Sequence, residues 1–278
     1  MNLPPRHQGG TRILLFSDLH LGCFPKSLRE LCGKRWQGFL NHQLLRRWRV
    51  RRDNISRLAR LLPELSPDLV LCGGDLTSVA LAEEFVEAKE ALQPILDWCG
   101  TERFCYLPGN HDLYVENDAS RNALEECFAT LNAGRWRRAE LPAVFALRDV
   151  EICLLDAARP VPWFRSFGVV DAQMQTRFQE CLKGMTAPHR LVFSHFPIVS
   201  ERGGRPNGRH GIRGAECVRN ALETGAVEAV LSGHVHHPCQ VQLASGGTQF
   251  CCGSLTMGGS FLVLDFQDTV VATTLMVY

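Results

Sequence analysis

The chain has 278 residues, a hydrophobic fraction of 45% and a formal net charge of +1. A chain of this length can bury the core of one large domain. It contains no apolar run of the roughly 18 residues that a membrane-spanning helix needs, and residues 1–10 lack the apolar centre of a signal peptide. These features argue against a helical membrane span, and we expect a cytoplasmic protein.

Twelve cysteines stand in positions that favour reduced thiols. Cys72, Cys105 and Cys153 lie in apolar strand-like segments, where a free cysteine behaves as a small hydrophobic residue. No Cys-x-x-Cys pair occurs, and Cys251 directly precedes Cys252. A reducing compartment therefore accounts for the cysteines better than disulfides do.

Strand-like and helix-like segments alternate along the chain. In the first half we predict strands at 13–16, 69–72 and 104–107, helices at 54–65, 82–98 and 119–131, and a hairpin of 144–147 with 151–155. In the second half we predict helices at 171–182 and 216–223 and strands at 191–193, 229–231, 248–252, 260–266 and 270–277. We expect Pro94 to bend or end its helix, Asp171 to cap the next one, and Gly225 to mark the end of the last. The alternation predicts an α/β fold.

Five polar clusters follow the predicted strands 13–16, 69–72, 104–107, 191–193 and 229–231. They are 18–20 (Asp-Leu-His), 74–75 (Gly-Asp), 109–112 (Gly-Asn-His-Asp), 194–195 (Ser-His) and 233–236 (Gly-His-Val-His). In open α/β sheets, ligand sites form where the carboxyl ends of strands meet. Glycines before the polar residues allow tight turns and close backbone approach.

The spacing within the clusters suits a pair of metal ions. Alternate residues of an extended chain point the same way, so Asp18 and His20 can address one side, as can His234 and His236. Imidazole, carboxylate and amide ligands without thiolate suit manganese, iron or zinc. One such cluster arises easily by chance. Five in order, each after a strand-like run, predict a shared metal site.

At these residues the sequence resembles the calcineurin-like metallophosphoesterase family, from about residue 11 to the C-terminus. The resemblance implies one domain over 11–278 with a four-layer α/β/β/α sandwich. It implies two divalent metals, of which manganese is favoured over iron or zinc. It also implies that His111 is catalytic and faces the substrate, and that Asp112 orients it. The implied metal ligands are Asp18, His20 and His236 for one ion, Asn110, His195 and His234 for the other, and Asp75 as the bridge.

A basic stretch lies between the first two clusters, within an expected insert at 24–66 that we predict to be an amphipathic helical cap. Residues 29–60 carry +8 and the whole chain +1, so the other residues carry −7. Trp36, Leu40, Leu44 and Trp48 recur every four residues and form a stripe on a helix. A basic helix with such a stripe is typical of an element lying on an anionic membrane.

Three interpretations of the stripe stay open. It could dock on the sandwich while the arginines remain solvated. It could contact a membrane or an amphiphilic substrate, which would place the protein peripherally at the inner face of a membrane. Its basic side could contact nucleic acid, although no nucleic-acid-binding module surrounds it. Contact with nucleic acid is the least favoured of the three. We predict no protein partner.

Further arginines are candidates for binding substrate. A segment after His195 is rich in glycine and arginine, and such a loop beside a metal ligand can clamp phosphate oxygens. The alternative is a surface loop whose arginines bind nothing specific. The candidates are Arg159, Arg205, Arg209 and Arg213.

We therefore expect a metal-dependent hydrolase of a phosphodiester or phosphoric anhydride, rather than a phosphoprotein phosphatase. The insert suggests a nucleotide-linked lipid or other phospholipid-like substrate, as for the pyrophosphatases that cleave UDP-2,3-diacylglucosamine. One branch of those enzymes carries Arg where this chain has His111, so a cyclic-nucleotide or broad-specificity phosphodiesterase is the alternative. A non-catalytic metal-bound scaffold is disfavoured because the motif set is complete.

Overall fold

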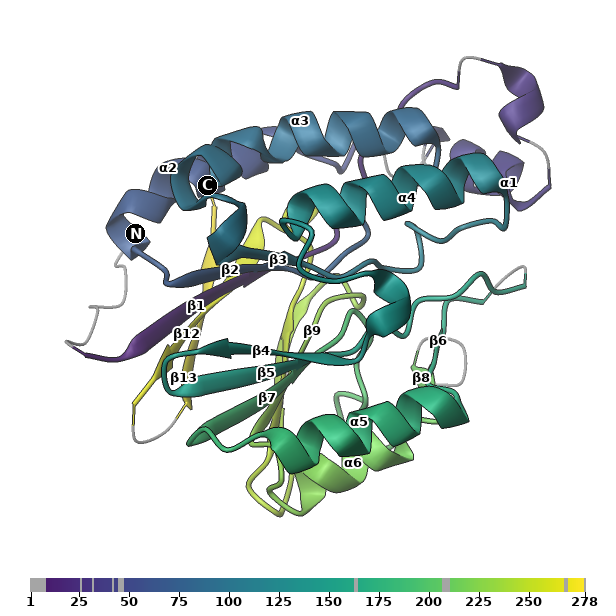
Figure 1. Ribbon diagram of the computed structural model, residues 1–278. Coiled ribbons are helices and arrows are strands. Elements are labelled where there is room, and N and C mark those ends of the chain that lie inside the picture. Colours follow the sequence, from purple (N-terminus) through teal and green to yellow (C-terminus); the bar gives the residue numbers. More distant parts are fainter. Residues whose placement is uncertain are drawn as a thin grey trace.

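Two β-sheets pack face to face between two layers of helices in the computed structural model (Figure 1). It describes residues 9–25, 27–31, 33–41, 43–44, 48–162, 165–206, 211–267 and 270–277. The α/β/β/α sandwich expected from the sequence is confirmed. Most of the buried apolar side chains form one core cluster, and a second lies between the second sheet and its helices.

The first sheet has the strand order β13-β12-β1-β2-β3. Its three parallel strands run in chain order, and β12 and β13 extend it antiparallel. Every residue of β1 is buried, which explains why its residues 13–16 are apolar without alternation. The strands are β1 (Thr11–Phe16), β2 (Leu69–Cys72), β3 (Phe104–Tyr106), β12 (Ser260–Phe266) and β13 (Val270–Met276).

The second sheet has the order β10-β11-β9-β7-β5-β4. The expected hairpin is β4 with β5, and the sequence did not predict the edge strand β10, which begins at a proline and is largely exposed. Two short strands, β6 and β8, pair separately. The bounds are β4 (Ala143–Leu147), β5 (Val150–Leu154), β6 (Gly168–Val169), β7 (His189–Phe193), β8 (Ile212–Arg213), β9 (Ala229–Ser232), β10 (Pro238–Gln242) and β11 (Thr248–Cys252).

Helices cover the outer faces of both sheets (Figure 1). α2 (Asp53–Leu65), α3 (Ala82–Cys99) and α4 (Asp118–Leu131) cover the first sheet, and α5 (Ala172–Gly184) and α6 (Glu216–Glu223) the second. As expected, Asp171 caps α5, with its Oδ1 accepting from the Met174 amide at 2.9 Å. α3 does not end at Pro94, because Ile95 and Cys99 beyond it are buried against the core.

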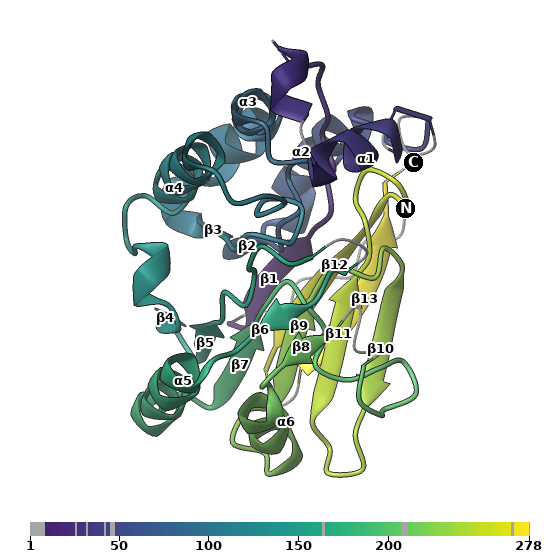
Figure 2. The same cartoon turned by 90° about the vertical axis from the view of Figure 1, so that its right-hand side faces the viewer.

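The insert contains η1 (Leu28–Leu31), which stands out from the top of the molecule in Figure 2, and α1 (Lys34–Asn41), which lies below it. α2, which we had also placed in the insert, packs Ile55, Leu58 and Leu62 into the core. The remaining 3-10 turns are η3 (Thr101–Arg103) and η4 (Arg138–Glu140). Among the described residues, no helix has both the length and the apolar character needed to cross a bilayer.

Candidate metal centre

The five polar clusters meet at the carboxyl edges of both sheets. Asp18 follows β1, Asp75 follows β2, Asn110 follows β3, His195 follows β7, and His234 and His236 follow β9. The parallel strands explain this convergence, because their carboxyl ends share one edge. Six of the seven predicted ligands are buried, and His236 is 30% exposed. The cluster pattern in the sequence therefore predicted a real assembly of side chains.

The backbone reaches this arrangement through left-handed turns rather than extended strand. φ is +60° at Asp18, +47° at His20, +51° at Asp75, +73° at His234 and +61° at His236. Few residues other than glycine adopt such angles, and those that do concentrate at functional sites. We expected Asp18 and His20, and likewise His234 and His236, to point the same way because the chain is extended. They do converge, but the backbone at these residues is in left-handed turns.

Three glycines let the loops approach one another closely. A Cβ on Gly74 would lie 2.3 Å from the Gly109 amide nitrogen, and one on Gly109 would lie 2.2 Å from Asp75 Oδ1. A Cβ on Gly233 would lie 2.6 Å from Asp18 Oδ2. Because these contacts involve neighbouring loops, a larger side chain would separate the ligands.

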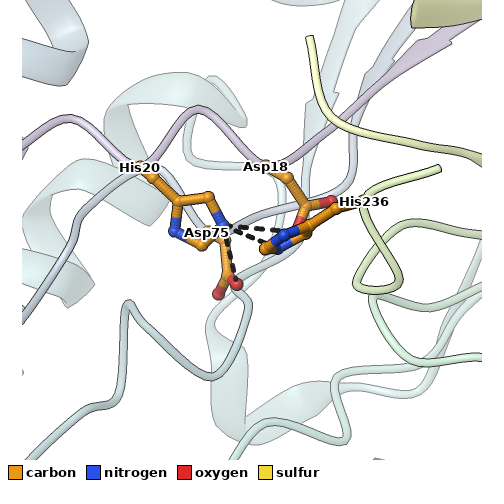
Figure 3. A group of neighbouring side chains, drawn as sticks. All are labelled: Asp18, His20, Asp75 and His236. Atoms are coloured by element: carbon orange, nitrogen blue, oxygen red, sulfur yellow. Dashed lines mark hydrogen bonds and ion pairs between the residues drawn. The ribbon is translucent and has the colours of Figure 1, made fainter. Parts of the chain in front are cut away.

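Four side chains form the first ligand group, and Figure 3 shows them pointing toward one another. His20 Nε2 lies 2.9 Å from His236 Nε2, 3.6 Å from Asp18 Oδ1 and 3.7 Å from Asp75 Oδ2. His236 Nε2 lies 3.2 Å from Asp18 Oδ1. Two imidazoles and two carboxylates around one point are a suitable set for a divalent transition metal.

The second group shares Asp75 with the first. His195 Nε2 lies 3.5 Å from Asp75 Oδ2, 3.2 Å from His234 Nδ1 and 3.3 Å from Asn110 Oδ1. His195 Nδ1 lies 2.6 Å from the Gly73 carbonyl, which can only accept, so Nδ1 carries the proton and Nε2 keeps its lone pair for a metal.

The buried carboxylates of Asp18 and Asp75 are suited to binding cations. Asp18 Oδ1 and Asp75 Oδ2 are buried and accept no hydrogen bond within the described residues. Burial raises the pKa of Asp75, and repulsion from Asp18 and Asp112 raises it further. Burial also acts to raise the pKa of Asp18, but the close imidazoles of His20 and His236 outweigh it and lower that pKa well below its usual value. Two bound divalent cations would relieve this repulsion.

His111 lies beside the ligands, and its ring is held by the backbone of a neighbouring loop. Its centroid is 4.7 Å from that of His20. Its Nδ1 lies 2.6 Å from the carbonyl oxygen of Ser78, so Nδ1 donates the hydrogen bond. His111 also lines a cavity of about 400 Å³ together with Asp75, Asn110, Ser166 and 234–237.

Asp112 does not have the role that we expected. Its Oδ1 accepts from the Thr77 amide at 3.0 Å and the Thr77 hydroxyl at 3.1 Å. Its Oδ2 accepts from the Tyr106 hydroxyl at 2.9 Å and the Gly109 amide at 3.0 Å. The carboxylate therefore holds the loop that carries Ser78, and the Ser78 carbonyl orients His111.

The four arginine candidates have different outcomes. Arg159 does not line the cavity beside the metal ligands. Its guanidinium donates to the Ala158 carbonyl at 2.6 Å and to Met174 Sδ at 3.1 Å, and it lines a second cavity. Arg205 is exposed, and Arg209 lies outside the described residues. The Arg213 Cζ atom lies 3.6 Å from the centre of the Phe167 ring. Phe167 directly follows Ser166, which lines the first cavity.

Sequence reasoning missed three contributors to the site. Ser166 lines the cavity, the Ser78 carbonyl orients His111, and Tyr114 stacks on His111. No signal could reveal the carbonyl, because every residue type supplies one. Tyr114 lies three residues after His111, and that proximity was the only available indication.

Comparisons with known proteins agree with this geometry. A dimetal phosphatase from Danio rerio has a similar fold, with a TM-score of 0.67 and 14% identity over 96% of this chain and 99% of that chain. A purple acid phosphatase from yellow lupin (Lupinus luteus) seeds gives a TM-score of 0.59 and 13% identity over 99% of this chain and 53% of that one. No curated protein sequence matches. The sequence model of calcineurin-like phosphoesterases matches residues 11–238. With that match and a geometry that supports a dinuclear metal site, the chain belongs to the calcineurin-like phosphoesterase family and is a metal-dependent phosphoesterase.

Proposed function

We propose that this protein hydrolyses a phosphodiester or phosphoric anhydride bond, with His111 as the acid that protonates the leaving oxygen. The observation that carries the proposal is the placement of His111 on the wall of the cavity whose lining includes Asp75, the residue common to both ligand groups. A substrate phosphoryl group in this cavity would meet the ligands and the acid at once.

We assign the ligands by the two groups. Asp18, His20 and His236 would hold one ion, and Asn110, His195 and His234 the other, with Asp75 between them. The donors are nitrogen and oxygen only, which supports manganese, iron or zinc, with manganese as our first choice. Bound divalent cations would supply polarisation of phosphoryl oxygens and acidification of water near neutral pH.

The chain's own groups supply the proton. Because Nδ1 of His111 donates to the Ser78 carbonyl, Nε2 is the ring atom that can give a proton to the leaving oxygen. The hydrogen bond suits both the neutral ring and the imidazolium, so the ring keeps its orientation as the proton leaves. Among the arginine candidates that the structure describes, Arg213 is the best placed to meet a substrate phosphate, because it is exposed and lies over the ring of Phe167, the residue after Ser166.

For the substrate we favour an amphiphile such as a nucleotide-linked lipid. The support is α1, whose Lys34 Nζ lies 4.4 Å from the centre of the Tyr114 ring that stacks on His111, while large apolar side chains of the same helix are exposed. A cyclic-nucleotide or broad-specificity phosphodiesterase is the second candidate. It is favoured by His111, which stands where one branch of the UDP-diacylglucosamine pyrophosphatases has arginine.

A panel of metals and substrates tests the proposal. Purified protein is stripped of metal, loaded with manganese, iron, zinc or magnesium, and assayed with bis-p-nitrophenyl phosphate, p-nitrophenyl phosphate, cyclic AMP and a UDP-linked lipid. We expect metal-dependent cleavage of the diester or the anhydride, with Asp75→Asn as the inactive control. Turnover of the monoester alone would contradict the proposal, and preference for cyclic AMP over the lipid would favour the second candidate.

A further inference from the structure

Five large apolar side chains of the insert are exposed. Of the seven exposed large hydrophobic residues in the described part of the chain, only Val86 and Val271 lie elsewhere. Trp48 is 80% exposed and Leu44 is 68% exposed. This contradicts the interpretation in which the stripe docks on the sandwich. We call this set the insert face: Phe24, Trp36, Leu40, Leu44 and Trp48.

α1 buries Phe39 as an ordinary surface helix would, but its two charged residues also point inward while Trp36 and Leu40 are exposed. Arg35 is only 6% exposed, and it donates to the Val79 carbonyl at 3.0 Å and the Ala80 carbonyl at 2.6 Å. Lys34 donates to the Val161 carbonyl at 3.1 Å. These bonds fix the helix with Trp36 and Leu40 directed at solvent. A surface helix normally presents polar residues there, and large apolar side chains left exposed in one segment point to an interaction site.

We propose that the insert face binds an anionic lipid bilayer. A bilayer offers an apolar interior and negative headgroups at the same surface, and this segment matches both. Residues 29–60 carry +8, and Arg49 and Arg51 are exposed next to Trp48. Tryptophan is the residue most typical of the boundary between headgroups and acyl chains. The segment also lies in the upper part of the molecule in Figure 2, where η1 projects from the body.

Nucleic acid fits the same face less well. Stacking on bases requires flat side chains, and Leu40 and Leu44 provide none. The two basic residues at the start of α1, Lys34 and Arg35, are used to anchor the helix and so do not form a row for phosphates on its exposed side. The apolar content of the face therefore decides in favour of lipid.

The bilayer contact is independent of the hydrolysis proposed above, and only its link to a lipid substrate rests on that proposal. α1 connects the two, since Lys34 on its inner side lies over the Tyr114 ring and Tyr114 stacks on His111. Binding to a bilayer would therefore place the cavity near the headgroup layer.

Vesicle flotation with the full chain tests the inference. We expect binding to vesicles of phosphatidylcholine with phosphatidylglycerol at low salt, weaker binding at high salt, and little binding to phosphatidylcholine alone. Combined Trp36→Ser, Leu44→Ser and Trp48→Ser substitutions should lower the bound fraction about tenfold or more, because apolar insertion and charge attraction act together. A matched variant, Val86→Ser with Val271→Ser, removes exposed apolar side chains elsewhere and should bind like the wild type.

Two more variants test whether loss of binding in the triple variant comes from misfolding. Trp48→Ser alone and Arg49→Gln with Arg51→Gln alter only exposed side chains, and each should weaken binding. All variants should cleave bis-p-nitrophenyl phosphate at the wild-type rate.

Absence of wild-type binding to anionic vesicles at low salt would overturn the inference, as would equal loss in the valine control. It would also fail if the wild type bound a single-stranded oligonucleotide but not vesicles, or if light scattering showed a dimer that the triple variant dissociates.

Discussion

The ring of Tyr114 stacks on that of His111, with centroids 5.2 Å apart and planes inclined by 21°. α1 packs against this tyrosine, since a Cβ on Gly38 would lie 2.6 Å from the Tyr114 hydroxyl oxygen. Together with the Ser78 carbonyl, Tyr114 restricts how the His111 ring can lie. The insert thus reaches the proposed catalytic group through the Tyr114 ring.

Loss of this contact should slow turnover without loss of metal. We expect Tyr114→Ala to lower kcat roughly tenfold to a hundredfold, because small misplacements of a reacting group are costly, and to change KM little. Tyr114→Phe keeps the ring and should retain most of the activity. Gly38→Ala should resemble Tyr114→Ala, because the new methyl group displaces the tyrosine. Steady-state kinetics and metal analysis check these outcomes, and equal loss in the Phe and Ala variants would refute the stacking role.

His111 and His236 should differ in what their removal costs. His111→Ala should keep both metals and slow turnover about a hundredfold or more, most strongly for substrates with poor leaving groups. His236→Ala removes a member of the first ligand group and should lose metal. Elemental analysis alongside rates for nitrophenyl and alkyl esters separates the two roles. If both variants lose metal equally, His111 is not the acid.

Asp75 should couple metal binding to pH. Burial and neighbouring carboxylates raise its pKa, so in the metal-free protein a proton must leave before a cation binds. We expect apparent metal affinity to rise with pH and protons to be released on binding, as measured by calorimetry in two buffers. Asp75→Asn should lose at least one metal and slow turnover about a hundredfold or more. Two ions per chain with normal turnover in this variant would exclude Asp75 as the bridge.

Glu84 should make stability depend on pH. It is buried and accepts from the Ser78, Val79 and Leu81 amides at 2.9–3.2 Å. Burial raises the pKa of Glu84 to about 7 from 4.5, despite these bonds and the nearby Arg35. The folded state then binds more protons than the unfolded state between these values, so its free energy of unfolding falls as pH rises through this window, by about 3 kcal/mol.

Urea unfolding of the metal-free protein at about pH 5 and about pH 8 measures this change. Glu84→Gln retains an accepting oxygen but cannot ionise, so its stability should depend less on pH than that of the wild type. The other titrating groups are common to both proteins, and identical pH dependence in the two would contradict the raised pKa.

Local sequence patterns determined much of the fold. The strands 248–252 and 260–266 and the helix 216–223 have the predicted bounds, because the apolar pattern of each segment is local to it. β10 and the two-residue strands β6 and β8 were missed, since each depends on its partner strand rather than on a pattern of its own. The side chains of the five clusters could be predicted because strand ends in an α/β sheet share an edge.

The sequence by itself determined the family, the order of the longer helices and central strands, and the set of side chains that meet at the metal centre. Only the tertiary structure decided which groups orient them. The partner of His111 Nδ1 is a backbone carbonyl 33 residues away in the chain, and Asp112, adjacent to His111, points elsewhere. Likewise, periodicity placed Trp36 and Leu40 on one side of a helix, but the bonds of Arg35 to distant carbonyls turned that side to solvent. Periodicity is a local property, whereas the direction of a side chain depends on contacts between residues far apart in the chain.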